Sequence, residues 1–173
     1  MSLWKRIFDR GSSRRLQPMY NAAVAAARRP AWYIEGGVPD TVDGRFDMIA
    51  AMLSLQLLRL EAEGDRYAAE NAQLAELFVE DMDGQLRESG IGDVVVGKHI
   101  GRMMAALGGR LGAYRDALTG DNSLEEALTR NLYRGEAPDP AALAWTAAQI
   151  RALHAAIGAT PVHMLMEGLW PEQ

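Results

Sequence analysis

Apolar residues recur every three or four positions along most of this chain, which predicts a series of amphipathic helices. The longest such pattern spans residues 77–118. We interpret it as the end of one helix, a turn, and a second long helix that packs back on the first. Gly90 suits the left-handed position just past a helix end, and Asp93 is placed to cap the second helix. We expect the other helices to surround this hairpin.

Two lines of residues run along the second helix of the hairpin. One is an apolar stripe, made of Val96, Ile100, Met103, Met104, Leu107, Leu111, Tyr114 and Leu118. The other is a line of small residues, made of Gly97, Gly101, Ala105, Gly108 and Gly112. Each glycine in a helix interior costs about 1 kcal/mol relative to alanine, so close packing should offset the cost. The packing partner is either the alanine-rich segment 22–27 or an apolar helix of another protein.

Asp81 lies on the apolar face of the first hairpin helix, between Leu77 and Phe78. Burying an unpaired carboxylate costs several kcal/mol, so Asp81 needs a partner. We predict a structural ion pair between Asp81 and Arg110, with Lys98 and Arg102 as the other candidates. The alternatives are that Asp81 is a half-exposed residue at the edge of this face, or that it is a functional acid or a metal ligand.

Shorter patterns predict the remaining helices. Asp65 is placed to cap the first hairpin helix, Ser123 and Glu126 form a capping box, and Asp139-Pro140 begins the helix after it. Including the first hairpin helix, the predicted ranges are 17–28, 43–64, 65–88, 123–134, 139–158 and 160–170. Together with the second hairpin helix they make about seven, in an all-α, single compact domain that we assign to residues 15–173. Residues 30–44 are rich in Pro, Gly and Asp and are predicted to form a loop, with Trp32 and Tyr33 buried as anchors.

Amino-acid composition and charge exclude several kinds of site and function. The chain has 173 residues and no cysteine, which excludes disulfides, cysteine-based zinc sites and cysteine nucleophiles. The sequence contains no run of about 18 apolar residues, so we predict no transmembrane helix. Net charge is −5, but residues 1–34 carry seven Lys/Arg and one Asp, for +6, while the remainder carries −11. Such an acidic body disfavours nucleic-acid binding.

Residues 1–14 form a separate basic, amphipathic segment without the apolar core of a secretory signal. We predict contact with a membrane surface or a ribosome through Trp4, Lys5, Arg6, Phe8, Arg14 and Arg15. The alternatives are that this segment folds onto the core or frays.

Catalytic patterns are absent from the sequence. His99, His154 and His163 lack the carboxylate spacing of a di-iron site, and no HExxH occurs. The carboxylates of residues 80–83 fan out around a helix and cannot converge on one ion. No glycine-rich loop follows a strand, and there is no G-x-S-x-G turn. We therefore expect no enzyme activity, no metal and no cofactor.

Two groups of residues carry a family resemblance. The first is the string VPDTVDGRFDM at residues 38–48. The second comprises Phe78, DMD at 81–83, LRE at 86–88, Gly90, Gly92-Asp93, Val96, Lys98, Gly109-Arg110 and Ala113-Tyr114. In these features, over about residues 30–120, the sequence resembles the ubiquinol–cytochrome c chaperone family.

The resemblance implies an assembly chaperone that binds newly made cytochrome b and assists the biogenesis of ubiquinol–cytochrome c reductase. Mitochondrial relatives act with a small partner protein near the ribosome exit. No mitochondrial presequence is visible here, so we expect a bacterial, cytoplasmic member that is peripheral at the inner membrane. The alternative is a non-enzymatic helical scaffold or oligomerisation module with no client groove.

A chaperone for a membrane protein needs an adaptable apolar surface, which methionine suits because its thioether chain repacks easily. We hypothesise a client-binding surface made of Val96, Ile100, Gly101, Met103, Met104, Leu107, Gly108 and Leu111, extended by Met48, Met52 and Met82. The alternative is that these methionines fill the core.

Overall fold

The computed structural model describes residues 10–88 and 96–171, with side chains for residues 15–84 and 101–171. All regular elements in these residues are helical, which confirms the all-α prediction. They are α2 (Arg10–Ala27), α3 (Ala31–Ile34), α4 (Val42–Glu61), the 3₁₀ turn η1 (Gly64–Tyr67), α5 (Ala68–Glu88), α6 (Val96–Thr119), α7 (Leu124–Asn131), α8 (Pro140–Ala159) and α9 (Val162–Met166).

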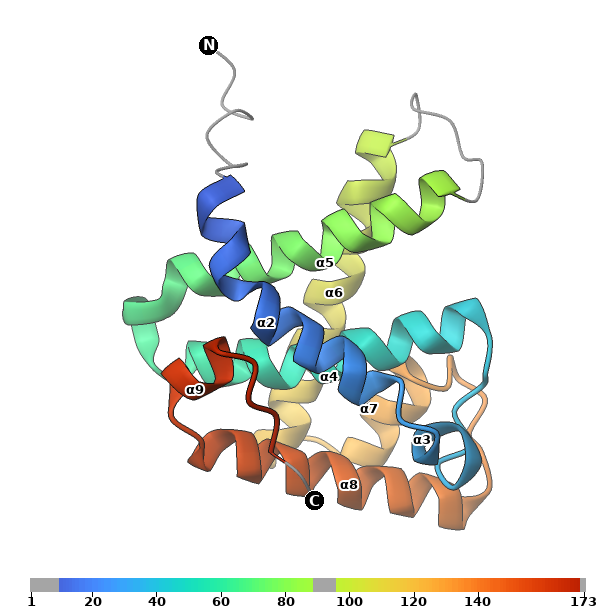
Figure 1. Cartoon of the computed structure of the whole chain (residues 1–173). Coiled ribbons are helices and arrows are strands. Elements are labelled where there is room, and N and C mark those ends of the chain that lie inside the picture. The colour runs from blue at the N-terminus through green and yellow to red at the C-terminus, as the bar shows by residue number, and fades with distance from the viewer. Residues whose placement is uncertain (1–9, 89–95, 172–173) are drawn as a thin grey trace.

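Helix α4 is the centre of the molecule. Every residue from 47 to 58 is buried, so the helix is enclosed on all its sides. Helices α2, α5, α6 and α8 pack against it, and Figure 1 shows α4 crossing the middle of the molecule between them. The predicted hairpin is therefore not the organising element. Its helices, α5 and α6, do contact each other, but each also covers part of α4.

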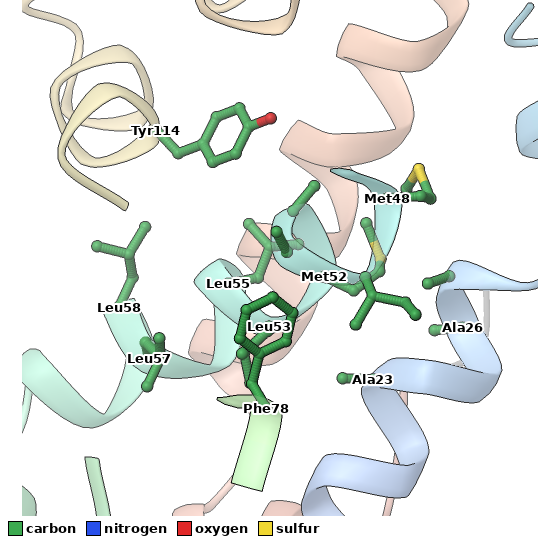
Figure 2. Packing of buried hydrophobic residues seen from close by; sticks show 14 of the residues in the cluster. Ala23, Ala26, Met48, Met52, Leu53, Leu55, Leu57, Leu58, Phe78 and Tyr114 are labelled. Carbon is green, nitrogen blue, oxygen red and sulfur yellow. The ribbon is translucent and has the colours of Figure 1, made fainter. Parts of the chain in front are cut away.

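Small residues let α2 approach α4 closely. In Figure 2, Ala23 and Ala26 of α2 lie toward Met48 and Met52 of α4, while Phe78 of α5 comes from another side. All five side chains are at most 3% exposed. The alanine-rich segment 22–27 thus packs against the central helix, and Met48 and Met52 are core residues rather than an extension of a client surface.

Two buried polar side chains on α4 have hydrogen-bond partners, as buried polar groups usually do. Ser54 Oγ donates to the carbonyl of Ala50 at 2.7 Å. Gln56 Nε2 donates to the carbonyl of Met19 at 2.9 Å, which ties α4 to α2. The third, Asp47, belongs to the site described below.

Capping explains several helix starts. Ser123 Oγ accepts from the Glu126 amide at 3.3 Å, which confirms the predicted cap. Asp139 Oδ1 accepts from the Ala141 amide at 2.8 Å, which confirms the predicted helix start. Helix α4 begins slightly earlier than predicted, because Thr41 is its cap.

Other boundaries differ from the prediction. Helix α2 includes Arg10, whereas the predicted helix began at residue 17, so Pro18 lies inside the helix rather than in its first turn. Leu16 before the proline and Met19 and Tyr20 after it are all buried, which supports helix on both sides of the proline. The predicted loop 30–44 contains α3, and Asp65 lies in η1 instead of capping α5. The predicted turn with Gly90 and Asp93 lies outside the described residues.

Candidate functional site

A groove of about 960 Å³ opens where α3 and the loop after it meet the first turns of α4. Its apolar lining consists of Pro30, Tyr33, Ile34, Val42, Phe46, Ile49, Met82 and Met103. Its charged lining consists of Arg28, Asp40, Asp43, Arg45 and Arg134. Helices α5 and α6 contribute one methionine each, and Arg134 comes from the connection between α7 and α8.

The rim of this groove is apolar and open. Ile34 is 75% exposed and Val42 is 84% exposed, whereas Ile49, Met82 and Met103 are buried and form the base. A single exposed apolar side chain on a protein surface is ordinary. Here Ile34 and Val42 lie together beside a groove with a buried apolar base. Another apolar segment that binds on this surface would be removed from water.

Hydrogen bonds hold α3 against the end of α2. Trp32 Nε1 donates to the carbonyl of Ala26, and the Tyr33 hydroxyl donates to the carbonyl of Ala27, both at 2.9 Å. Trp32 is buried, as predicted, while Tyr33 is half-buried beside the groove. Ile34 is thereby placed at the rim, at the end of a helix whose other side is anchored.

The loop before α4 lies directly on the first turn of that helix. Thr41 Oγ1 accepts from the Gly44 amide at 3.1 Å. A Cβ at Gly44 would collide with the backbone oxygen of Pro39, so only glycine allows this approach. The close packing fixes Val42 and Asp43 at the mouth of the groove.

A buried carboxylate lies beneath the groove. Asp47 is fully buried and binds two arginines, with Arg110 Nη2 2.5 Å from Oδ1 and Arg134 Nε 2.5 Å from Oδ2. Arg134 also reaches Asp43, at 2.8 Å. The Arg110 guanidinium lies 5.6 Å from the centroid of the Phe46 ring. This network joins α4, α6 and the α7–α8 connection under one wall of the groove.

The Arg134 backbone has a φ of +54°, a conformation that residues other than glycine rarely adopt. Its two ion pairs offset the backbone strain, because they are formed only when the α7–α8 connection is held in this position. The two carboxylates raise the pKa of Arg134 above its usual value, chiefly through the hydrogen bond to Asp47.

The structure corrects the predicted pairing of Asp81 with Arg110, because Arg110 binds Asp47 instead. Asp81 accepts a hydrogen bond from the Tyr20 hydroxyl at 2.7 Å. The physical reason is the helix arrangement: Arg110 faces α4, whereas Asp81 faces α2. Burial and, next, the hydrogen bond to Asp81 raise the pKa of Tyr20.

The predicted client surface on α6 is divided between two faces of the helix. Met103 and Leu107 are buried against the core and Leu111 is half-buried, whereas Gly101, Met104 and Gly108 are exposed. Val96 and Ile100 lie in α6, but their side chains are outside the described ones. Met82 and Met103 do line the groove, so this part of the hypothesis coincides with the structural site.

Three glycines of the line of small residues on α6 face open space in the described structure. A Cβ added at Gly101, Gly108 or Gly112 would meet no atom of the described structure within 4 Å. Of the two packing partners that the sequence left open, residues 22–27 are therefore wrong for these three glycines, because α2 packs on α4 and α5.

The predicted membrane or ribosome contacts remain predictions. Trp4, Lys5, Arg6 and Phe8 lie outside the described residues, and so does the side chain of Arg14. Arg15 is exposed, with its Nη1 4.0 Å from Glu70. Helix α2 runs without a break through the boundary that we placed between residues 14 and 15.

Neither a metal cluster nor a membrane span is found in the part of the chain that the structure describes. No three His, Asp or Glu side chains there are grouped to hold an ion. None of the described helices combines the length and apolar character that a membrane crossing requires.

Sequence reasoning missed Arg28, Ile34 and Val42 as site residues. It treated residues 30–44 as a loop because no helical period runs through them. The available signal was two large aliphatic residues in a segment otherwise rich in Pro, Gly and Asp, where neither has a periodic partner to bury it.

Comparison with known proteins identifies the family. Residues 35–170 match the family model described as ubiquinol-cytochrome C chaperone, a range that includes most of the groove. A crystal structure of the Cbp3 homolog from Brucella abortus is similar, with a TM-score of 0.78 and 31% identity over 96% of this chain and 94% of that chain. A search of curated proteins returns no match. The chain therefore belongs to the ubiquinol-cytochrome c chaperone family.

Proposed function

We propose that this protein is an assembly chaperone that binds newly made cytochrome b and assists the biogenesis of ubiquinol–cytochrome c reductase. Family membership supports the chaperone role. The observation that carries the client-binding part is the groove, with Ile34 and Val42 exposed above a buried base of Ile49, Met82 and Met103.

The chemistry of the groove suits an apolar client. Burying apolar surface stabilises a complex by about 25 cal/mol per Å², and it needs no fixed directional contacts. Met82 and Met103 adapt to side chains of different shape because the thioether chain is flexible and polarisable. A chaperone that covers a segment of a membrane protein before insertion requires such tolerance.

A binding role needs no reacting group, and we propose a non-enzymatic function. The carboxylates that line the groove are engaged in ion pairs, Asp40 with Arg45 at 2.7 Å and Asp43 with Arg134 at 2.8 Å. Both pairs shape the rim of the groove.

A second contact surface belongs to the same proposal. It is an open strip on α6 made of Gly101, Met104 and Gly108. The client or a small partner protein would bind to this strip. The basic N-terminal segment would bring the chaperone to the cytoplasmic side of the inner membrane or to the ribosome.

Photo-crosslinking in the native cells tests the proposal. A photoreactive residue is placed at Val42 in the groove, at Met104 on α6, or at the exposed Ala152 on α8 as a matched control. We expect cytochrome b on the Val42 probe and none on the Ala152 probe. Recovery on Met104 alone keeps the role and moves the surface to α6. Recovery on no probe contradicts the role.

Exposed apolar side chains also suit self-association, which is the alternative function. A Val42 probe that crosslinks two copies of this chain, in a protein whose solution mass is that of a dimer, would favour the scaffold. A variant with Ile34→Ser and Val42→Ser separates loss of binding from loss of folding, because side chains this exposed change stability by only about 0.5 kcal/mol.

A further inference from the structure

The charges that line the groove are unequal. Three arginines and two aspartates contribute, so the lining carries a net charge of +1. Asp47 and Arg110 lie beneath the groove and cancel each other. The groove is therefore apolar with a small positive excess, although the protein as a whole has a net charge of −5.

Because most of these charges form ion pairs, the excess positive charge of the groove lies on one side chain. Arg45 binds Asp40, and Arg134 binds Asp43 as well as Asp47. Arg28 forms no ion pair with any residue of the described structure, and it is exposed. It follows the end of α2 directly, beside Tyr33 and Ile34, so an unpaired guanidinium lies next to the apolar rim.

The half-buried Tyr33 shows that these charges surround one end of the groove. Burial raises the pKa of the Tyr33 hydroxyl, Arg45 and Arg28 lower it, and Asp40 raises it. All three charged side chains are thus close enough to act on the same hydroxyl. Two of them neutralise each other, which leaves Arg28 as the group that a bound partner can pair with.

We propose that the groove binds an apolar polypeptide segment that carries an aspartate or glutamate, and that Arg28 pairs with this carboxylate while the apolar side chains cover Ile34 and Val42. This inference rests on the proposed chaperone function and names the kind of client segment that the site selects. Arginine suits the task, because its planar guanidinium binds both oxygens of a carboxylate and is only weakly hydrated.

Shape and charge together favour a polypeptide. A volume of about 960 Å³ accommodates several side chains at once. An amphipathic helix places such anchors at spacings of three and four residues. A carboxylate on the same face, one turn away from the apolar anchors, would then meet Arg28 at the end of the groove. The remaining charges are already paired, so a second charged group on the partner would find no match.

The test uses two synthetic peptides of about twelve residues, rich in Leu and Ala, that differ only in one Glu or Gln beside the apolar anchors. Fluorescence anisotropy measures their binding to the full-length protein. We expect the Glu peptide to bind about threefold to fivefold more tightly, which is the size of effect for an exposed ion pair. The Arg28→Gln variant should lose this preference and keep its affinity for the Gln peptide.

Two further variants make the test specific. Arg29→Gln removes a neighbouring charge that does not line the groove and should leave the preference unchanged. Arg28→Glu should reverse the preference for a carboxylate, so that a third peptide, with Lys in place of that Glu, binds more tightly than the Glu peptide. Equal binding of the Glu and Gln peptides to the unmodified protein overturns the proposal, and so does loss of preference with Arg29→Gln.

Competition identifies the occupant. Sodium dodecanoate carries a carboxylate on an apolar chain. If its dissociation constant, measured by displacement of the Glu peptide from the unmodified protein, is lower than that of the peptide, the site prefers a lipid and the proposal fails. The two proposals also fail separately. Cytochrome b on the Val42 probe without any Glu preference contradicts the role of Arg28 alone. A Glu preference in the peptides without cytochrome b in cells supports the groove chemistry and contradicts the named client.

Discussion

Asp47 is fully buried, yet its carboxylate binds guanidinium groups from two segments that are far apart in the chain. Removing charges from water is costly. Close ion pairs in the interior compensate for that cost only when both arginines and the carboxylate are present. Arg134 retains substantial contact with water, and Arg110 packs over Phe46. Asp47 therefore acts as the fixed point from which one wall of the groove is positioned.

We expect Asp47→Asn to destabilise the protein by about 3 kcal/mol, near the lower end of the range for breaking a buried ion pair, because both arginines keep some solvation. Urea unfolding followed by circular dichroism measures the change. Asp43→Asn is the matched control: it removes an exposed pair with the same Arg134 and should cost about 1 kcal/mol or less. Equal costs for the two variants would contradict the role of Asp47.

Tyr114 gives a prediction about alkaline pH. Its hydroxyl is buried and has no hydrogen-bond partner in the described structure, and burial raises its pKa above the usual 10.0. Above pH 10 the unfolded chain releases this proton and the folded protein keeps it. This group therefore leaves stability unchanged below pH 10 and lowers it as pH rises above 10, by about 1.4 kcal/mol per pH unit while the folded hydroxyl stays protonated.

Tyr114→Phe should therefore lose about 1.4 kcal/mol less stability than the unmodified protein between pH 8 and pH 11. At pH 8 the variant should be at least as stable, because it removes an unpaired buried hydroxyl. Urea unfolding at the two pH values measures both effects. A variant with the same loss between pH 8 and 11 would show that this hydroxyl reaches water in the folded state.

Helix α6 combines two surfaces of different character. Its inner face, with Met103, Leu107 and Tyr114, is part of the core. Its outer face carries glycines beside which the described structure leaves room for a side chain. Glycine inside a helix is unfavourable, and here no close approach within the chain explains it. The glycines of the outer face therefore make α6 less stable than it would be with alanine at the same positions.

Gly101→Ala and Gly108→Ala should each stabilise the protein by about 1 kcal/mol, because alanine is the better helix former and meets no clash. Thermal unfolding should show a rise of about 2–4 °C per substitution. Gly44→Ala is the contrasting variant, since its Cβ would collide with the Pro39 oxygen, and it should lower the unfolding temperature. A lower unfolding temperature for Gly101→Ala would mean that the outer face of α6 is covered in solution.

At the scale of the whole molecule, local signals predicted the helices but not their arrangement. The caps at Ser123 and Asp139 depend on neighbouring residues, so the sequence alone was sufficient for them. The apolar face of α4 was visible at Phe46, Ile49 and Leu53, but its burial on every side depends on helices that follow much later.

The candidate site was only partly predictable for the same reason. Met82 and Met103 were chosen because of their chemistry, and both line the groove. Ile34 and Arg28 became site residues only through the position of α3 against α2 and α4. The partner of Arg110 could not be inferred either, since Asp47 lies 63 residues away in the chain and is brought near by packing alone.

The enclosure of α4 has a consequence for synthesis on the ribosome. Helices α6 and α8 cover part of α4 but follow it in the chain. At a synthesis rate of about 5–20 residues per second, α4 waits roughly 5–20 seconds before α8 is complete. During that interval the nascent chain carries an apolar helix without its full cover. For that time, the protein has the same need that we propose it meets for its client.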